Sequence, residues 1–271
     1  MQTIDDNGKG LSTTGLGHGD AHHVGDLDPY RHGQEFFGCN ESAPANNYKD
    51  PTTGKLLYRF LSGTDDGRAM AGNFCNSFPG AMAFSAHDTP ISCVTCGHVG
   101  GLTSNGVTMN FRIYWDGDLL EESFNGTGTR NSNGYISKYN SGNIKTLDGS
   151  LTNNDTKATP CMQGDILGDW REEVMMRTAD NKIRIYTTTM PTKWRNYTLW
   201  HDHQYRNAMV WQMCGYNQPP HTSYFLGELE GITSAPPAVT MTDKTEIANG
   251  GSISGKDGNL IVCETNDMSV K

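Results

Sequence analysis

Hydrophobic residues in this chain gather in short runs that lack the spacing of an amphipathic helix. The apolar and aromatic runs lie at residues 35–37, 56–61, 109–115, 173–177 and 182–187. Pairs typical of tight turns separate them: Asp-Gly at 66–67, 116–117 and 148–149, and Asn-Gly at 125–126 and 133–134. No long stretch free of Gly and Asn places apolar residues at i, i+3, i+4 and i+7. The pattern predicts short strands and an antiparallel all-β protein.

A loop motif recurs along the chain and sharpens the expected fold. Residues 25–35 and 72–82 share a Gly-Asp or Gly-Asn opening, a second Gly and a closing Glu or Met, and a related segment spans residues 164–173. The copies recur at roughly 40–50 residues or twice that spacing, which is typical of the blades of a β-propeller. At this spacing, residues 1–232 have room for about five blades.

The last part of the chain differs in character. Residues 233–237 read Thr-Ser-Ala-Pro-Pro, which is typical of a linker, and polar, Gly-broken strands such as 260–263 follow. We therefore expect a partial β-propeller domain over residues 1–232 and a linker with a short β-rich extension over residues 233–271.

Composition excludes several classes of protein. The 271 residues include 21 Lys+Arg and 30 Asp+Glu, and the formal net charge of −9 argues against nucleic-acid binding. With 9 Phe, 11 Tyr and 5 Trp, the chain is too aromatic to be disordered. It has no run of about 18 apolar residues, so we expect no membrane span. The N-terminus shows no secretory signal, so the protein is cytoplasmic or its true N-terminus is missing.

The seven cysteines do not indicate a disulfide framework, because their number is odd and the chain is long. Cys93 and Cys96 form a Cys-x-x-Cys pair, with His98 as the nearest histidine. A zinc site would need a second pair of ligands, and buried structural cysteines are the favoured alternative.

Carboxylates in the first copy of the loop motif suit a hard cation. Asp26 and Asp28 lie on the loop and Glu35 opens the next strand, so their oxygens can converge on one ion. Calcium takes roughly six to eight oxygen ligands. We therefore predict calcium at Asp26, Asp28 and Glu35, with a solvated acidic turn as the alternative.

The other acidic loops differ in their ligands. The second copy, residues 73–82, has no acidic residue where the first copy has Asp26, Asp28 and Glu35, so it is expected to bind an ion weakly or not at all. The third copy keeps them, and its expected calcium ligands are Asp165, Asp169 and Glu172. Asp116 and Asp118 form a fourth cluster, for which a plain hairpin turn is an equal alternative.

Residues 17–23 contain three His and one Asp, with a glycine on each side of His18. The glycines let the backbone approach a ligand closely. Imidazole and carboxylate groups can bind a metal ion or contact an anionic sugar. We include His18 and Asp20 among the predicted metal ligands, with a His-rich surface loop as the alternative.

Longer blocks of sequence go beyond these short motifs. They lie at residues 17–20, 25–29, 114–118, 154–157, 168–174, 199–206 and 216–221. On these blocks the chain resembles the rhamnogalacturonan lyases of polysaccharide lyase family 11, over about residues 10–230. The resemblance implies an eight-bladed β-propeller stabilised by calcium. Members of this family cleave the alternating rhamnose–galacturonate backbone of pectin by β-elimination.

The chain departs from this family in three respects. We expect it to lack the first half of the propeller. It has no acidic residue in the loop copy at residues 73–82, and it carries the extension over residues 233–271. A propeller closes as a ring, and an incomplete ring leaves open strand edges. We therefore expect a C-terminal part of a longer lyase.

The resemblance also implies a set of catalytic residues. β-Elimination on a uronate needs a cation beside the C6 carboxylate, a base for the C5 proton and an acid for the departing C4 oxygen. The residues matched to these needs are Arg68 for the carboxylate, Lys157 as proton acceptor and Tyr216 as proton donor or as a group that positions the sugar. The roles of Lys157 and Tyr216 can be exchanged. The residues expected to bind sugar hydroxyls are Asn154, Thr156 and Asn217.

The leading interpretation is a calcium-dependent lyase that acts on rhamnogalacturonan I. A non-catalytic carbohydrate-binding remnant is the main alternative, and an adhesion propeller with calcium loops ranks below both. We expect a pectic polysaccharide as partner and a monomer at full length. We also expect a location that is secreted, periplasmic or at the cell surface, because a polymeric substrate cannot enter cells.

Overall fold

The computed structural model of the protein describes residues 2–109, 111–155, 157–212, 218–228, 252–254 and 260–262. The chain divides into two compact units, residues 1–237 and residues 238–271. The expected boundary between residues 232 and 233 lies outside the described residues, so the linker stays a prediction. In the second unit β19 (Ser252–Ser254) pairs antiparallel with β20 (Leu260–Val262).

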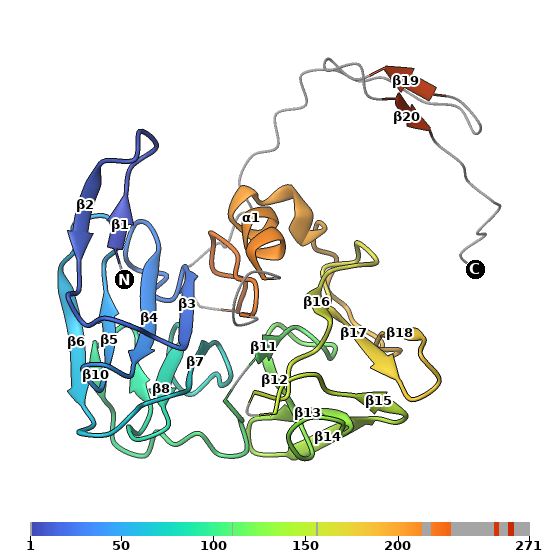
Figure 1. Ribbon diagram of the computed structural model, residues 1–271, viewed down its shortest axis with the longest axis horizontal. Coiled ribbons are helices and arrows are strands. Elements are labelled where there is room, and N and C mark those ends of the chain that lie inside the picture. The colour runs from blue at the N-terminus through green and yellow to red at the C-terminus, as the bar shows by residue number, and fades with distance from the viewer. Residues whose placement is uncertain are drawn as a thin grey trace. The chain divides into compact units, whose positions relative to one another are not determined.

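The first unit consists mainly of four antiparallel sheets of four strands, which follow one another in the chain (Figure 1). Sheet I contains β3 (Ala21–Gly25), β4 (Glu35–Asn40), β5 (Ala45–Lys49) and β6 (Leu56–Leu61). Sheet II contains β7 (Ala69–Gly72), β8 (Met82–Ser85), β9 (Ile91–Ser92) and β10 (Gly97–His98). Sheet III contains β11 (Phe111–Ile113), β12 (Glu122–Gly126), β13 (Gly134–Lys138) and β14 (Gly142–Leu147). Sheet IV contains β15 (Ser150–Leu151), β16 (Met162–Gly164), β17 (Glu173–Thr178) and β18 (Ile183–Tyr186).

These sheets confirm the all-β class. In sheets I, II and III each strand pairs with the next in sequence, as in a propeller blade. No sheet closes on itself within the described residues, so the propeller stays a prediction. A short hairpin of β1 (Gln2–Ile4) and β2 (Gly10–Thr13) precedes sheet I. None of the helices described in this chain has the length and apolar character that crossing a bilayer requires.

Sheet II lies between two hydrophobic cores, and successive side chains of its strands contribute alternately to one core and the other. In β7 and β8, Ala71 and Ala83 pair in register and pack toward Phe37 and Tyr48 of sheet I. Met70 is in the other core, which sheet II forms with the loop that leads to sheet III. Successive residues of a strand point to opposite faces, so this alternation places sheet II between two packed layers.

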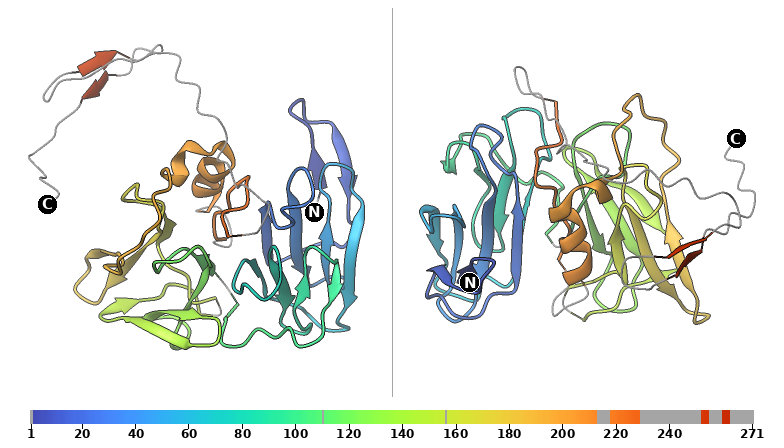
Figure 2. Two further views of the ribbon diagram at one scale, coloured as in Figure 1. Left: turned by 180° about the vertical axis from the view of Figure 1, so that it is seen from behind. Right: turned by 90° about the horizontal axis from the view of Figure 1, so that it is seen from above.

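The helical content is small, and the sequence pattern did not reveal it. A 3₁₀ turn, η1 (Leu199–His201), is followed by α1 (His203–Trp211), which Asp202 caps by accepting from the N–H of Gln204. The buried face of α1 consists of Tyr205, Ala208 and Met209. Figure 2 shows from two further directions that α1 lies between sheet I and sheets III and IV.

A buried glutamate anchors the motif loop in three of the four sheets. Glu35, Glu122 and Glu173 are the first residues of β4, β12 and β17, and all three are fully buried. Each carboxylate accepts two consecutive backbone N–H groups of the preceding loop. The donors are Leu27 and Asp28, Trp115 and Asp116, and Ile166 and Leu167, at 2.9–3.2 Å. The recurring motif therefore has a structural function, since it satisfies the loop backbone at each sheet entry.

A pair of buried histidines joins sheet I to the segment after α1. Nδ1 of His23 lies 2.8 Å from Nε2 of His221, and Nε2 of His23 lies 3.3 Å from the carbonyl oxygen of Ala69. Burial lowers the pKa of His23 to about 3 and holds the pKa of His221 well below its ordinary value. The contact therefore requires neutral imidazoles.

We expect the substitution His23→Gln to change how stability depends on pH. The pKa of His23 is about 3 in the folded protein, against an ordinary value of 6.5. The contribution of His23 to the free energy of unfolding is therefore complete above pH 6.5, and it is lost as the pH falls toward 3. The free energies of unfolding of wild type and variant should converge by up to about 1.4 kcal/mol per pH unit in that window. Urea unfolding at several pH values measures this, and a constant difference would contradict it.

Candidate active site

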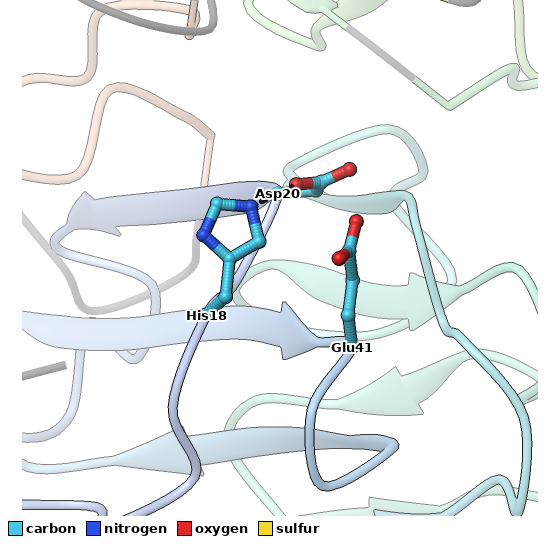
Figure 3. A group of neighbouring side chains, drawn as sticks. All are labelled: His18, Asp20 and Glu41. Atoms are coloured by element: carbon cyan, nitrogen blue, oxygen red, sulfur yellow. Dashed lines mark hydrogen bonds and ion pairs between the residues drawn. The ribbon is translucent and has the colours of Figure 1, made fainter.

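The side chains of His18, Asp20 and Glu41 meet beside the first strand of sheet I. Nε2 of His18 lies 2.9 Å from Oδ1 of Asp20. One ligand atom from each of the three residues lies within 4.8 Å of the others. Figure 3 shows the imidazole and the two carboxylates directed toward one another from the residues that flank β3 and β4. The group thus offers two carboxylates and one imidazole to a cation.

Backbone contacts bring these residues together. The N–H of Glu41 donates to the carbonyl oxygen of His18 at 3.0 Å, which joins the loop before β3 to the residue just after β4. A Cβ atom at Gly19 would lie 2.5 Å from the carbonyl oxygen of Cys39, so only glycine fits this close approach. Asn40 donates from its side-chain amide to the carbonyl of His18 at 3.2 Å and secures the same loop.

Lys157 reaches this cluster from the loop between β15 and β16 of sheet IV. Its Nζ donates to Oδ2 of Asp20 at 2.7 Å and to the carbonyl oxygen of Gly67 at 3.0 Å, and the side chain is buried. The loop is held by Asn154, whose Oδ1 accepts from the N–H of Lys157 at 3.0 Å. Ala158, the next residue, has a φ of 48°, which is a strained conformation for an L-residue. The loop therefore presents Lys157 in a fixed conformation.

Arg68 lies next to Gly67, at the start of sheet II. Burial lowers the pKa of its guanidinium to about 10. Among the described residues, Nε and Nη1 of Arg68 have no hydrogen-bond partner. Arg68 lines a cavity of about 680 Å³ together with Phe84, Leu102, Ser104, Met109 and Ala158. A buried guanidinium with unused donors is ready to bind an anion such as a carboxylate.

The charges of the cluster are unbalanced without a further cation. Burial raises the pKa of the Asp20 carboxyl, but the adjacent Lys157 ammonium outweighs burial and leaves that pKa below its ordinary value. The hydrogen bond to Asp20 raises the pKa of Glu41, because two neighbouring carboxyls share a proton more easily than they both ionise. A divalent ion can take the place of that shared proton, so the donor set fits a cation.

The first motif loop directs its acids to other partners. Oδ2 of Asp26 accepts from the N–H of Phe225 at 2.9 Å, and Oδ1 of Asp28 accepts from the N–H of Tyr30 at 3.1 Å. Nε of Arg31 lies 3.4 Å from Asp28 and 3.5 Å from Glu35. Asp26, Asp28 and Glu35 form no mutually close trio of ligand atoms within the described part of the chain. Calcium at this loop therefore stays a prediction.

The third motif loop divides its acids between two environments. Oδ2 of Asp165 accepts from the N–H of Leu199 at 2.7 Å, and Asp169 pairs with Arg171 at 2.8 Å. Glu172 is buried like Asp165, and its carboxylate lies 2.7 Å from Nη1 of Arg112. This loop, too, contributes no close trio of potential ligands among the described residues.

The fourth acidic cluster encloses a cation from the chain itself. Asp116, Asp118 and Glu122 have ligand atoms within 4.8 Å of one another, and Nζ of Lys138 donates to all three. Lys138 lies 2.8 Å from both Asp118 and Glu122. Lys138 is the last residue of β13, and nothing in the sequence around it indicates that it pairs with this acidic cluster. The turn and the acidic cluster are therefore parts of one ion-paired structure.

We expect Lys138→Met to lower the free energy of unfolding by about 2–3 kcal/mol. This is less than the ~3–5 kcal/mol of a fully buried pair, because the Lys138 side chain is 18% exposed. Calcium should restore part of the stability, since three carboxylates then lack a cation. Lys182→Met, which breaks an exposed pair with Asp180, is the matched control and should cost at most about 0.5 kcal/mol. An unchanged melting temperature in Lys138→Met would contradict the assignment.

The structure therefore brings together four of the predicted site residues: His18, Asp20, Asn154 and Lys157. Arg68 adjoins them through Gly67. Tyr216, Thr156 and Asn217 lie outside the described residues, and their roles stay predictions. Glu41 escaped the sequence analysis because it is an isolated acid, and only strand pairing brings it beside Asp20. The described cysteines are free thiols and belong to no close trio of potential metal ligands.

Comparison with known proteins places these residues in a family. Residues 1–237 match the family model described as rhamnogalacturonan lyase family 11, C-terminal domain. The chain belongs to rhamnogalacturonan lyase family 11. It is 46% identical over 232 residues to rhamnogalacturonan endolyase YesW of Bacillus subtilis, covering 83% of this chain and 36% of that protein. It is 42% identical over 245 residues to rhamnogalacturonan exolyase YesX of the same organism, covering 83% and 39%.

Solved structures agree with this membership of family 11. The crystal structure of YesW superposes with a TM-score of 0.78 at 44% sequence identity, over 87% of this chain and 40% of that chain. The family-11 chain described here thus spans less than half the length of the relatives it matches. The resemblance found in the sequence is confirmed.

Proposed function

We propose that this chain carries catalytic residues of a rhamnogalacturonan lyase, which cleaves the rhamnose–galacturonate backbone of pectin by β-elimination. The contact of buried Lys157 with Asp20 carries the proposal. It brings a candidate proton acceptor beside the group of His18, Asp20 and Glu41. Arg68, whose Nε and Nη1 have no hydrogen-bond partner among the described residues, lines the adjoining cavity. The names of the relatives supply the class of substrate and reaction.

Each step of the elimination needs a specific group. Removal of the C5 proton builds negative charge beside the uronate carboxylate, and the Arg68 guanidinium stabilises that charge. Lys157 is the proposed proton acceptor, and its amine must be neutral when it takes the C5 proton. Tyr216 is the proposed proton donor to the departing C4 oxygen, and Asn154, Thr156 and Asn217 are proposed to bind sugar hydroxyls.

Calcium is the proposed cofactor. His18, Asp20 and Glu41 would hold it, because two adjacent carboxylates favour a hard cation. When bound, calcium would neutralise the carboxylate of the substrate as a Lewis acid. Calcium at Asp26, Asp28 and Glu35 or at Asp165, Asp169 and Glu172 belongs to the same proposal, as a stabiliser of the sheets.

The architecture proposed for the whole enzyme is a β-propeller of which this chain holds part. The four-stranded antiparallel sheets that follow one another in sequence support it. A location that is secreted, periplasmic or at the cell surface is proposed from the substrate, because polymeric pectin cannot enter cells.

One assay tests the proposal directly. We expect the chain to raise ultraviolet absorbance on rhamnogalacturonan I, since elimination leaves a conjugated unsaturated uronate that hydrolysis does not produce. A chelator should abolish the rise, and added calcium should restore it. Folded protein that binds the polysaccharide without any rise would overturn the lyase. It would favour a carbohydrate-binding remnant.

A further inference from the structure

The side-chain amide of Gln218 pairs with the main chain on both sides of Ala21. Its Oε1 accepts from the N–H of His22 at 3.1 Å, and its Nε2 donates to the carbonyl oxygen of Asp20 at 3.1 Å. Gln218 is buried, with 2% of its surface exposed, although it lies nearly two hundred residues further along the chain. Both polar ends of a buried amide are thus used on one short piece of backbone.

Among the described residues, no strand other than β4 pairs with this piece of backbone. β3 is the terminal strand of sheet I, and its ladder with β4 begins at the pair of Ala21 and Cys39. Asp20 therefore lies one residue beyond the ladder. Its carbonyl points to the open edge of the sheet, where alternate residues of a strand direct their main-chain groups.

The position of Asp20 determines the geometry of the candidate site. Its carboxylate contacts Nζ of Lys157 at 2.7 Å and Nε2 of His18 at 2.9 Å, and it neighbours Glu41. A shift of the Asp20 backbone would move the partner of Lys157 and one candidate cation ligand together. A reacting group misplaced by about 1 Å costs about 10²-fold in rate.

We propose that Gln218 is a positioning residue of the active site, which fixes Asp20 and through it Lys157 by completing the open edge of β3. The functional part of this inference rests on the lyase proposed above. The structural part does not, because it concerns contacts among residues of this chain alone.

A second glutamine on the same edge provides a matched control. Nε2 of Gln204 in α1 donates to the carbonyl oxygen of Val24 at 3.2 Å, further along β3 and away from Asp20. Gln204→Met therefore also removes a hydrogen bond from this strand edge. If removing a hydrogen bond only weakened β3 in general, the two variants Gln204→Met and Gln218→Met would change the labelling of Lys157 and the rate of elimination to a similar extent.

The test compares the chemical reactivity of Lys157 in the full chain. Acetic anhydride labels lysines, and mass spectrometry gives the labelling of Lys157 relative to Lys182, whose side chain is 76% exposed. We expect Gln218→Met to raise the relative labelling of Lys157 about fivefold, the factor that corresponds to one lost hydrogen bond. Gln204→Met should leave it unchanged. Gln218→Glu retains the acceptor for the N–H of His22, so its relative labelling of Lys157 should lie between those of Gln218→Met and Gln204→Met. If Gln218→Met does not fold, the comparison of Gln218→Glu with Gln204→Met tests the inference.

Kinetics add a measurement that a purely structural role would not change. We expect Gln218→Met to lower kcat about 10²-fold with KM nearly constant, while Gln204→Met keeps both values. Unchanged labelling of Lys157 in Gln218→Met, or equal effects of the two glutamines, would overturn the inference. Increased labelling in a chain that shows no elimination would support the positioning of Lys157 and would count against the lyase itself.

Discussion

Lys157→Arg is expected to fold normally and to lose elimination almost completely. Arginine can keep the ion pair with Asp20, which Lys157 makes at 2.7 Å, but it stays protonated at every accessible pH and cannot accept the C5 proton. Loss of a positioned general base costs about 10²–10⁴-fold in rate. The ultraviolet assay on rhamnogalacturonan I measures this at saturating calcium.

Two controls separate this loss from damage to the fold. Lys182→Met removes an exposed lysine and should keep full activity. The melting temperature of Lys157→Arg should remain close to that of the wild type, because the buried charge pair is retained. Substantial elimination by folded Lys157→Arg would show that another group takes the proton, and the exchanged role of Tyr216 would then be favoured.

Much of the strand pattern could be predicted because it depends on neighbours in sequence. The apolar run at 56–61 is β6, and the runs at 173–177 and 182–187 fall in β17 and β18. The prediction of a turn at Asn125 and Gly126 was wrong, since both residues lie inside β12 and pair with β13. Helix α1 was missed because its nine residues include Asn207 and bury only a narrow face.

From the residue pattern alone, the candidate site could be predicted only where its motif was contiguous. Lys157, Asn154 and Arg68 were predicted from the family resemblance. His18 and Asp20 belong to one short loop, whereas Glu41 joins them through strand pairing. The basic residues that pair with the acidic motifs could not be predicted, because they too are distant in sequence. Lys138 and Arg112 are separated from their carboxylates by up to 60 residues, and nothing near either residue marks it as a counter-ion. Ligand types in a loop therefore indicated charge clusters without identifying their cation.

Arg112→Met is expected to produce the largest loss of stability, about 3–5 kcal/mol. The Arg112 side chain is fully buried between two glutamates, with Nη1 2.7 Å from Glu172 and Nε 3.3 Å from Glu121. It also donates to the carbonyl oxygen of Pro220, and so it joins β11 to the segment that carries Gln218. Methionine fills a similar volume but leaves both acids buried without a counter-ion.

The loss should be greater at alkaline than at acidic pH. Burial raises the pKa of Glu172 to about 7 even with the guanidinium beside it, which lowers that pKa. Without Arg112 the pKa must rise further, so Glu172 stays protonated at low pH and its ionisation becomes more costly as the pH increases. Because the folded pKa lies above the ordinary value of 4.5, the stability of Arg112→Met should fall as the pH rises from that value through neutrality.

Urea unfolding near pH 5 and pH 8 distinguishes this electrostatic loss from a packing defect. Arg184→Met, which removes an exposed guanidinium on β18, should cost at most about 0.5 kcal/mol at either pH. Adding Glu172→Gln to Arg112→Met should recover part of the stability at pH 8, because an amide needs no counter-ion. A loss that is equal at both pH values and unaffected by Glu172→Gln would mean that Arg112 stabilises the fold by packing, and that its charge contributes little.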